Sequence, residues 1–348
     1  MELLKLTYVM DYKTLMHEPV SSYKDYLKDH QYVNISKDIN SIKDFIDLAE
    51  EYPYDIHITY NIDMKMIHNI KEELRTLDNM VGLETLKQNI IYQIMYFVQH
   101  MNSKNEYLHT CIYGAPGTGK TEIAKCIGTI FSKLGILKKG TFTKITRADL
   151  VAGYLGQTAI KTKKLIEDNL GGVLFIDEAY SFGNKNDKDD AFAKECIDTL
   201  CETLSHYRDQ LMVIIAGYED DLDTCFFKLN KGLKSRFSWK FWIDAYTSSQ
   251  LKDIFVMKVK EDKWKLDISN TILENWFKEK YDSFPYFGRD VEVFLSKVKI
   301  CHSKRVFMLD KKVKRTIIKK DLDDGYDLMK KHKKIEEKKE EYVFSMYS

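Results

Sequence analysis

The sequence predicts an α/β fold whose central part is a doubly wound parallel sheet. Two observations lead to this prediction. Between residues 78 and 243, short apolar segments alternate with amphipathic helical patterns, which is typical of a parallel sheet with helices on both faces. A glycine-rich turn at residues 114–119 lies between the first apolar segment and the first helical pattern. Sheets of this kind bind their ligands at such turns.

Each predicted strand is a short apolar run that fits burial on both sides of a sheet. The strands are expected at 111–113, 142–146, 173–176 and 212–216, with a fifth candidate at 239–243. A helix is expected at 121–134, and Gly135 is placed to end it. A second helix is expected between the third and fourth strands, where apolar residues at helical spacing form one stripe. That stripe consists of Phe192, Cys196, Leu200 and Leu204.

The regions on either side of this sheet have different patterns. Residues 1–77 predict a small accessory domain with a helix at 41–51 and a strand at 56–60. Residues 244–325 lose the strand pattern and predict a small helical domain, followed by a charged tail at 326–348. The stretch 297–341 is rich in lysine. A solvated helical face is the ordinary interpretation, and binding to an acidic partner or nucleic acid is the alternative.

Composition excludes several classes of protein. The net charge of +1 over 348 residues gives no strong overall field for nucleic acid or a membrane surface. Six scattered cysteines predict buried thiols in a reducing compartment. The N-terminus lacks a secretory pattern, and no apolar run reaches the roughly 18–20 residues that span a bilayer. We therefore expect a cytoplasmic protein with no membrane partner.

The glycine-rich turn matches the pattern G-x-x-x-x-G-K-[ST]. Its glycines allow successive backbone N–H groups to surround phosphate oxygens, and the following helix directs its positive end at the same anion. Lys120 is expected to reach the β and γ phosphates, and the Thr121 hydroxyl to bind Mg²⁺. A plain glycine turn before a helix is the alternative. The predicted nucleotide-binding residues are Gly114, Ala115, Pro116, Gly117, Thr118, Gly119, Lys120, Thr121 and Glu122.

Two carboxylates follow the third predicted strand. Asp177 and Glu178 end the apolar run 173–176, at the strand end that faces the ligand in a parallel sheet. Asp177 is expected to hold Mg²⁺, and Glu178 to act as general base for the attacking water. Two exposed acids at the end of a strand are the alternative.

A second nucleotide pattern lies a few residues downstream. Residues 184–187 read Asn-Lys-Asn-Asp, which fits the N-K-x-D pattern that reads guanine in GTPases. It lies in a polar loop and not at the end of a later strand. We therefore interpret it as a coincidence and expect adenine to be the base.

Several ordered motifs together resemble the CbxX/CfxQ branch of the AAA ATPases, which includes red-type rubisco activases and SpoVK-like proteins. The resemblance covers roughly residues 78–300. The sequence of these segments is also similar to that of the cfxQ-like proteins of giant DNA viruses. The motifs are 79–83, the Walker A and B segments at 114–121 and 173–180, the pore-loop segment 149–158, 215–218, the arginine-finger box 230–237 and the sensor 2 region 288–291.

This resemblance implies roles for residues outside the two Walker motifs. Val81 and Gly82 would line the adenine pocket. Arg236 would be an arginine finger that projects into a neighbour's ATP site, and Arg289 would contact the γ phosphate from the helical domain. A surface arginine is the competing interpretation for both. Tyr218 stands at the sensor 1 position, where many relatives carry Asn or Thr, and a packing role is equally open.

The resemblance also implies a pore loop. Tyr154, Leu155 and Gly156 match an aromatic–hydrophobic–glycine pattern with which a ring of loops would grip an extended polypeptide. The alternative is that Tyr154 packs in a core. The flanking glycines favour a mobile loop.

Together these motifs predict a P-loop doubly wound sheet with a C-terminal helical lid and a small N-terminal accessory domain. The expected catalytic residues are Lys120, Glu178, Arg236 and Arg289, with ATP and Mg²⁺ as cofactors. The expected partners are further copies of the chain in a ring, a hexamer by the resemblance, and a protein client. Two other functions stay open: a nucleic-acid-associated ATPase and an ATP-binding assembly scaffold. If the chain is viral, the host cytoplasm is the expected compartment.

Overall fold

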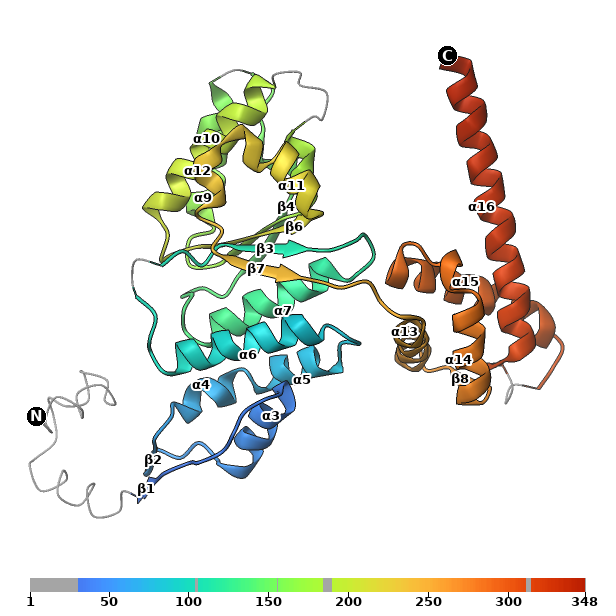
Figure 1. The fold of residues 1–348 in the computed structure, drawn as a ribbon, viewed down its shortest axis with the longest axis horizontal. Helices are drawn as coiled ribbons and strands as arrows, with labels where there is room; N and C mark the ends of the chain where they lie inside the picture. The colour runs from blue at the N-terminus through green and yellow to red at the C-terminus, as the bar shows by residue number, and fades with distance from the viewer. Residues whose placement is uncertain (1–30, 104–105, 155, 184–189, 311–313, 348) are drawn as a thin grey trace, which may run out of the picture.

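The computed structural model describes residues 31–347 apart from 104–105, 155, 184–189 and 311–313, and it describes side chains up to residue 335. Within these residues the chain forms a five-stranded sheet with helices on both faces, an N-terminal segment below one layer of helices, and a separate helical group at one side (Figure 1).

The central sheet confirms the predicted fold class. Its order is β4-β5-β6-β3-β7, and all neighbouring strands are parallel. The strands are β3 Thr110–Tyr113, β4 Phe142–Ile145, β5 Val173–Ile176, β6 Met212–Gly217 and β7 Trp239–Trp242. Because the strands run in one direction, the loops that follow β3, β5 and β6 all emerge at the same edge of the sheet.

Alternate residues of the strands bury into two different cores. Phe175 and Ile214 belong to the core under α6 and α7, whereas Leu174 and Val213 belong to the core on the other face. This period of two is the consequence of the pleat. The helices of the sheet region are α6 Glu84–Val98, α7 Lys120–Lys133, α8 Arg147–Leu150, α9 Gln157–Asp168, α10 Ala191–His206, α11 Glu219–Cys225 and α12 Lys231–Lys234, with short 3₁₀ turns η1 Ala179–Phe182 and η2 Phe227–Leu229.

The N-terminal segment packs on the helical layer formed by α6 and α7. Its elements are β1 Gln31–Val33, α3 Ile42–Glu51, β2 Ile58–Tyr60, α4 Met64–Asn69 and α5 Lys71–Asn79, and the two strands pair in parallel. The predicted helix at 41–51 is confirmed, since Ser41 caps α3 in a capping box with Asp44. Leu74 and Leu77 are fully buried in the same core cluster as α6 and α7, so this segment shares a core with the sheet region.

The C-terminal group, which we call the lid, combines helices with one small sheet. Its elements are α13 Ser248–Glu261, β8 Lys265–Asp267, α14 Asn270–Glu279, η3 Tyr281–Ser283, α15 Phe287–Val306, β9 Thr316–Ile318 and α16 Lys319–Tyr347. The predicted helical character is confirmed, and the structure adds a short parallel pair, β8 and β9, that was not predicted. Strands of three residues are too short to show a period-two pattern in the sequence.

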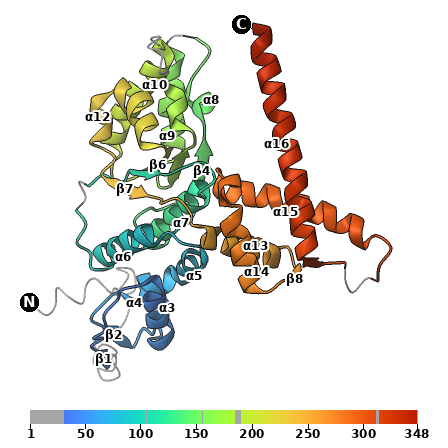
Figure 2. The ribbon, with the colours of Figure 1, turned by 45° about the vertical axis from the view of Figure 1, so that its right-hand side comes forward.

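Helix α16 begins inside the lid and projects beyond it (Figures 1 and 2). Tyr326 and Met329 are buried in the lid core, so the helix crosses the predicted limit at residue 325 without a break. The division of the chain into domains remains our proposal. No helix in the described part of the chain is both long and apolar enough to cross a bilayer.

Candidate nucleotide-binding site

The glycine-rich turn, from here on the phosphate loop, joins the end of β3 to the start of α7. Gly117 and Gly119 have φ of +78° and +81°, which glycine adopts without steric cost. The N–H of Gly114 donates to the carbonyl of Gly217 on β6 at 3.1 Å, which anchors the loop to the sheet. The Lys120 ammonium donates to the carbonyls of Gly114 and Ala115 at 2.9 and 2.7 Å.

The surroundings of Lys120 bring together two of the predicted catalytic groups, Lys120 and Arg289, and the predicted metal ligand Asp177. Burial lowers the pKa of Lys120, while the nearby Asp177 carboxylate acts in the opposite direction and the Arg289 guanidinium in the same one. Lys120, Thr121 and Glu122 form the first turn of α7. The loop, an anchored lysine and a helix N-terminus therefore converge at the carboxyl edge of the sheet.

The acidic pair lies at this edge, directly after β5. The N–H of Asp177 donates to the carbonyl of Ile145 at 3.0 Å, and its carboxylate lies 2.5 Å from the Lys144 ammonium. Glu178 is exposed and has a left-handed backbone, with φ of 51°. Burial raises the pKa of Tyr180, and the charge of Glu178 adds to this effect.

These residues fit a nucleotide phosphate with its metal ion. Gly119 has open space on the side where a Cβ would point, so its backbone is accessible to a ligand. Mg²⁺ prefers oxygen ligands and is usually held by one or two carboxylates together with substrate phosphates. The Thr121 hydroxyl and the Asp177 carboxylate are donors of this kind. They would hold the ion, and the phosphate loop would hold the phosphates.

The lid closes against the phosphate loop. The N–H of Gly288, in the first turn of α15, donates to the carbonyl of Gly117 at 3.0 Å. The hydroxyl of Tyr246, just before α13, donates to the carbonyl of Thr118 at 3.2 Å. Arg289 is exposed beside the same loop. Its predicted position near the γ phosphate is thus compatible with the geometry.

The predicted adenine segment lies between the sheet region and the lid. Val81 packs against the lid core, and Gly82 has φ of +67° with Gln250 of α13 next to it. Tyr218 directly follows β6, the strand between β3 and β5, and 45% of its side chain is exposed. Exposure of this size argues against the packing role that the sequence left open.

Arg236 lies at the other edge of the sheet. Its Nε donates to the Ser205 hydroxyl at 2.6 Å, and its guanidinium also bonds the Gly232 carbonyl and lies 6.0 Å from the Tyr107 ring. This region adjoins the amino ends of β3 and β7, where Ser238 bonds the carbonyl of Tyr107. Four strand residues, about 13 Å, separate it from the phosphate loop. The structure therefore does not bring Arg236 to the Lys120 of its own chain.

Tyr154 is on the surface. Its side chain is 74% exposed, so the alternative of a core tyrosine is wrong. Gly156, with φ of +82°, is the N-cap residue of α9. Leu155 and the guanine-like pattern at 184–187 lie outside the described residues.

Sequence reasoning missed two residues of this site. Lys144 on β4 pairs with Asp177, and Tyr246 bonds the phosphate loop. The only local signal for Lys144 is its charge within a predicted strand. Nothing near Tyr246 in the sequence indicates its contact, because its partner lies 128 residues away.

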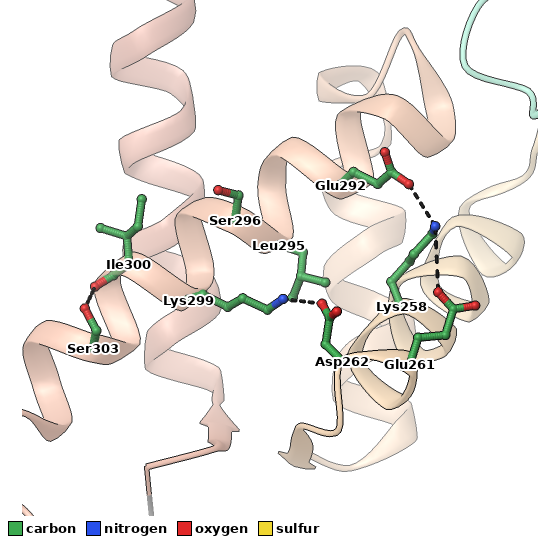
Figure 3. A pocket seen from close by; sticks show the side chains of 9 residues that line it. All are labelled: Lys258, Glu261, Asp262, Glu292, Leu295, Ser296, Lys299, Ile300 and Ser303. Carbon is green, nitrogen blue, oxygen red and sulfur yellow. Dashed lines mark hydrogen bonds and ion pairs between the residues drawn. The ribbon is translucent and has the colours of Figure 1, made fainter.

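The lid also carries a groove of about 600 Å³ between α13 and α15 (Figure 3). Both of its lysines are paired with carboxylates: Lys258 pairs with Glu292 at 2.8 Å, and Lys299 pairs with Asp262. None of the residues that line the groove is one of the predicted site residues. The lining is Lys258, Glu261, Asp262, Glu292, Leu295, Ser296, Lys299, Ile300 and Ser303.

Comparisons with known proteins show the family to which this chain is similar. Residues 110–245 match the AAA family, described as the ATPase family associated with various cellular activities. A cfxQ-like protein of Acanthamoeba polyphaga mimivirus is 37% identical over 290 residues, which is 82% of this chain and 71% of that protein. The chloroplastic ribulose bisphosphate carboxylase/oxygenase activase of Cyanidioschyzon merolae is 33% identical, over 68% of this chain and 84% of that one.

A solved structure shares the fold. The AAA domain of FIGL-1, crystallised with ADP, superposes with a TM-score of 0.53 at 20% sequence identity, and the match covers 72% of this chain and 82% of that one. At this identity the likeness concerns the fold alone.

Proposed function

Because this chain belongs to the CbxX/CfxQ branch of the AAA ATPases, we propose that it hydrolyses ATP with Mg²⁺ at the interfaces of a ring and uses the energy to remodel a protein client. The ATPase activity follows from the family. The metal, the ring, the client and the role of each residue belong to the proposal.

The proposed chemistry uses groups at the carboxyl edge of the sheet. The phosphate loop and Lys120 hold the phosphates, and Arg289 contacts the γ phosphate. The carboxylate of Glu178 accepts the proton of the attacking water, which requires a base within hydrogen-bond reach. Thr121 and Asp177 hold Mg²⁺, which when bound neutralises negative charge on the phosphates. Tyr218, which directly follows the strand between β3 and β5, orients the water or the γ phosphate.

The position of Arg236 is the observation that supports the proposed ring. It lies at the amino edge of the sheet, whereas the phosphate loop lies at the carboxyl edge. An arginine that assists phosphoryl transfer must touch the γ phosphate. Arg236 can do this only at the site of another subunit that presents its carboxyl edge to this amino edge. Repetition of one such head-to-tail contact generates a ring when the rotation closes.

The proposed client is a polypeptide. Tyr154 is exposed between glycines just before α9. This position suits a side chain that holds a polypeptide whatever the sequence of that polypeptide. The name of the activase from Cyanidioschyzon merolae describes action on another enzyme, which supports a protein substrate. An opposing candidate, a nucleic-acid-stimulated ATPase, is supported only by the lysine-rich stretch 297–341.

Mixing two inactive variants tests the ring. Lys120→Ala should lose nucleotide binding, and Arg236→Ala should bind ATP normally but hydrolyse it at least about 10³-fold more slowly. Mixed assemblies should regain activity, because some interfaces pair an intact phosphate loop with an intact Arg236. Lys231→Ala, which removes an exposed cation near Arg236, is the matched control and should stay active.

The proposal fails if mixing restores nothing after subunit exchange has been demonstrated by fluorescence transfer. It also fails if a protein shown to be monomeric by sedimentation hydrolyses ATP at the full rate. Stimulation of hydrolysis by single-stranded DNA or RNA and not by protein would favour the nucleic-acid function.

A further inference from the structure

A lysine of the C-terminal helix reaches the start of α15. The Lys333 ammonium lies 3.2 Å from the Asp290 carboxylate and donates to the carbonyl of Ser283 at 3.0 Å. Lys333 is half-buried, whereas its neighbour Lys334 is exposed. The lysine-rich stretch therefore contains at least one cation with a defined partner inside the lid.

Asp290 needs such a partner because it is buried. Only 4% of the residue is exposed, and a buried carboxylate is costly unless it is paired and hydrogen-bonded. One oxygen accepts the N–H of Tyr286 at 2.8 Å, and the other faces Lys333. Removal of Lys333 would take away the cation that faces one oxygen of this buried carboxylate, which is destabilising.

The segment fixed by Asp290 is the one that touches the phosphate loop. The carbonyl of Tyr286 occupies the space next to Gly117, and the N–H of Gly288 bonds the Gly117 carbonyl. Arg289 lies between Gly288 and Asp290 in the chain. A shift of Asp290 would therefore shift Arg289 relative to the phosphates.

Helix α16 holds Lys333 in place. Gly325 lies so close to the backbone of Val298 on α15 that a Cβ there would approach within 2.8 Å. The Tyr326 hydroxyl makes a 2.8 Å hydrogen bond with the Ser283 hydroxyl. Helices α15 and α16 cross each other (Figure 2). The position of Lys333 is thus set by packing over two turns of α16.

We propose that Lys333 is a positioning residue for Arg289, so that the C-terminal helix determines how well the protein distinguishes ATP from ADP. This inference rests on the proposed contact between Arg289 and the γ phosphate. Arg289 can sense that phosphate only if its segment is held against the phosphate loop, and Lys333 with Asp290 holds it. A partner that binds or moves α16 would then change the preference of the protein for ATP over ADP.

Binding of two nucleotides tests the proposal. The dissociation constants of ATPγS and ADP are measured by displacement of a fluorescent nucleotide from the full-length protein. Lys333→Met should lower the preference for ATPγS over ADP by about 3- to 10-fold and leave ADP affinity unchanged, a size typical of residues that couple two parts of a protein. Lys333→Arg should restore most of the preference, and Lys334→Met should match the wild type.

Arg289→Ala, measured in parallel, separates the two proposals. If Arg289→Ala lowers the preference and Lys333→Met does not, the role of Lys333 is wrong and that of Arg289 stands. If neither lowers it, both are wrong. Equal weakening of ATPγS and ADP by Lys333→Met, with a lower melting temperature, would show a structural role only and overturn the inference. If Lys333→Met does not fold, Lys333→Gln, which can still donate to the Ser283 carbonyl, is judged by the same outcomes.

Discussion

The carbonyl of Gly117 in the phosphate loop accepts a 3.0 Å hydrogen bond from the N–H of Gly288 at the start of α15. The lid thus contacts the backbone of the loop itself and not only a nucleotide held between them. On the side where a Cβ at Gly117 would point lies the carbonyl of Tyr286. The close fit of loop and lid therefore depends on glycine at this position.

A pair of glycine substitutions measures this contact. Gly117 and Gly119 both have positive φ, so alanine at either position costs about 1–2 kcal/mol through the backbone. At Gly119 a Cβ meets nothing within 4 Å, whereas at Gly117 it overlaps the Tyr286 carbonyl. Gly117→Ala should therefore destabilise the protein by about 1–3 kcal/mol more than Gly119→Ala in urea unfolding without nucleotide. Equal losses would mean that the lid contact contributes nothing to stability.

The second prediction concerns the acidic pair. Glu178 is exposed, so Glu178→Gln replaces a side chain with little packing to lose. The variant should bind ATP within a few-fold of the wild type but turn over roughly 10²-fold more slowly, because the base is removed and the phosphate loop is intact. Steady-state hydrolysis and nucleotide titration check this. Hydrolysis at the wild-type rate would exclude Glu178 as the base.

The third prediction concerns Lys144, whose ammonium pairs with the Asp177 carboxylate that is proposed to hold Mg²⁺. The two side chains are 50% and 27% exposed, and ion pairs of this kind contribute about 1 kcal/mol or less. Lys144→Met should therefore lower the Mg²⁺ concentration for half-maximal hydrolysis by up to about fivefold. Lys138→Met, which removes an exposed cation before the same strand, should leave it unchanged. A higher Mg²⁺ requirement in Lys144→Met would show that Lys144 supports the site and does not compete for it.

The parts that could be predicted from sequence are those fixed by local pattern. The run 173–176 is apolar throughout because β5 is buried on both faces. The pattern at 114–121 follows from the need for backbone N–H groups to surround the phosphate oxygens. Both features depend on residues that are close together in the sequence, so they can be predicted from one sequence.

The parts that could not be predicted depend on contacts between distant segments. Tyr246 bonds Thr118, and β8 pairs with β9, across long separations that no local pattern encodes. The buried Asp290 looks like an ordinary acidic residue in the first turn of a helix, since its partner Lys333 lies on another helix. The lysine-rich stretch was therefore interpreted as a solvated face, and this interpretation misses Lys333.

The last prediction concerns Tyr154, the residue proposed to grip the client. Its side chain is 74% exposed, so Tyr154→Ala should change the free energy of unfolding by no more than about 0.5 kcal/mol. It lies outside the phosphate loop and the acidic pair, so ATP binding and basal hydrolysis should stay near the wild type. Stimulation of hydrolysis by a client should be lost, while Tyr154→Phe should retain it, because grip by an aromatic ring does not require the hydroxyl.

The client for this measurement is the protein recovered with Glu178→Gln, which should hold ATP and client together. Ile160→Ala is the matched control, because it removes another exposed apolar side chain, 70% exposed, from the same helix region. If Tyr154→Ala and Ile160→Ala respond alike to the client, Tyr154 has no special role in grip. If Tyr154→Ala keeps full client stimulation, the client does not pass by this loop, and the remodelling proposal would then rest on the family alone.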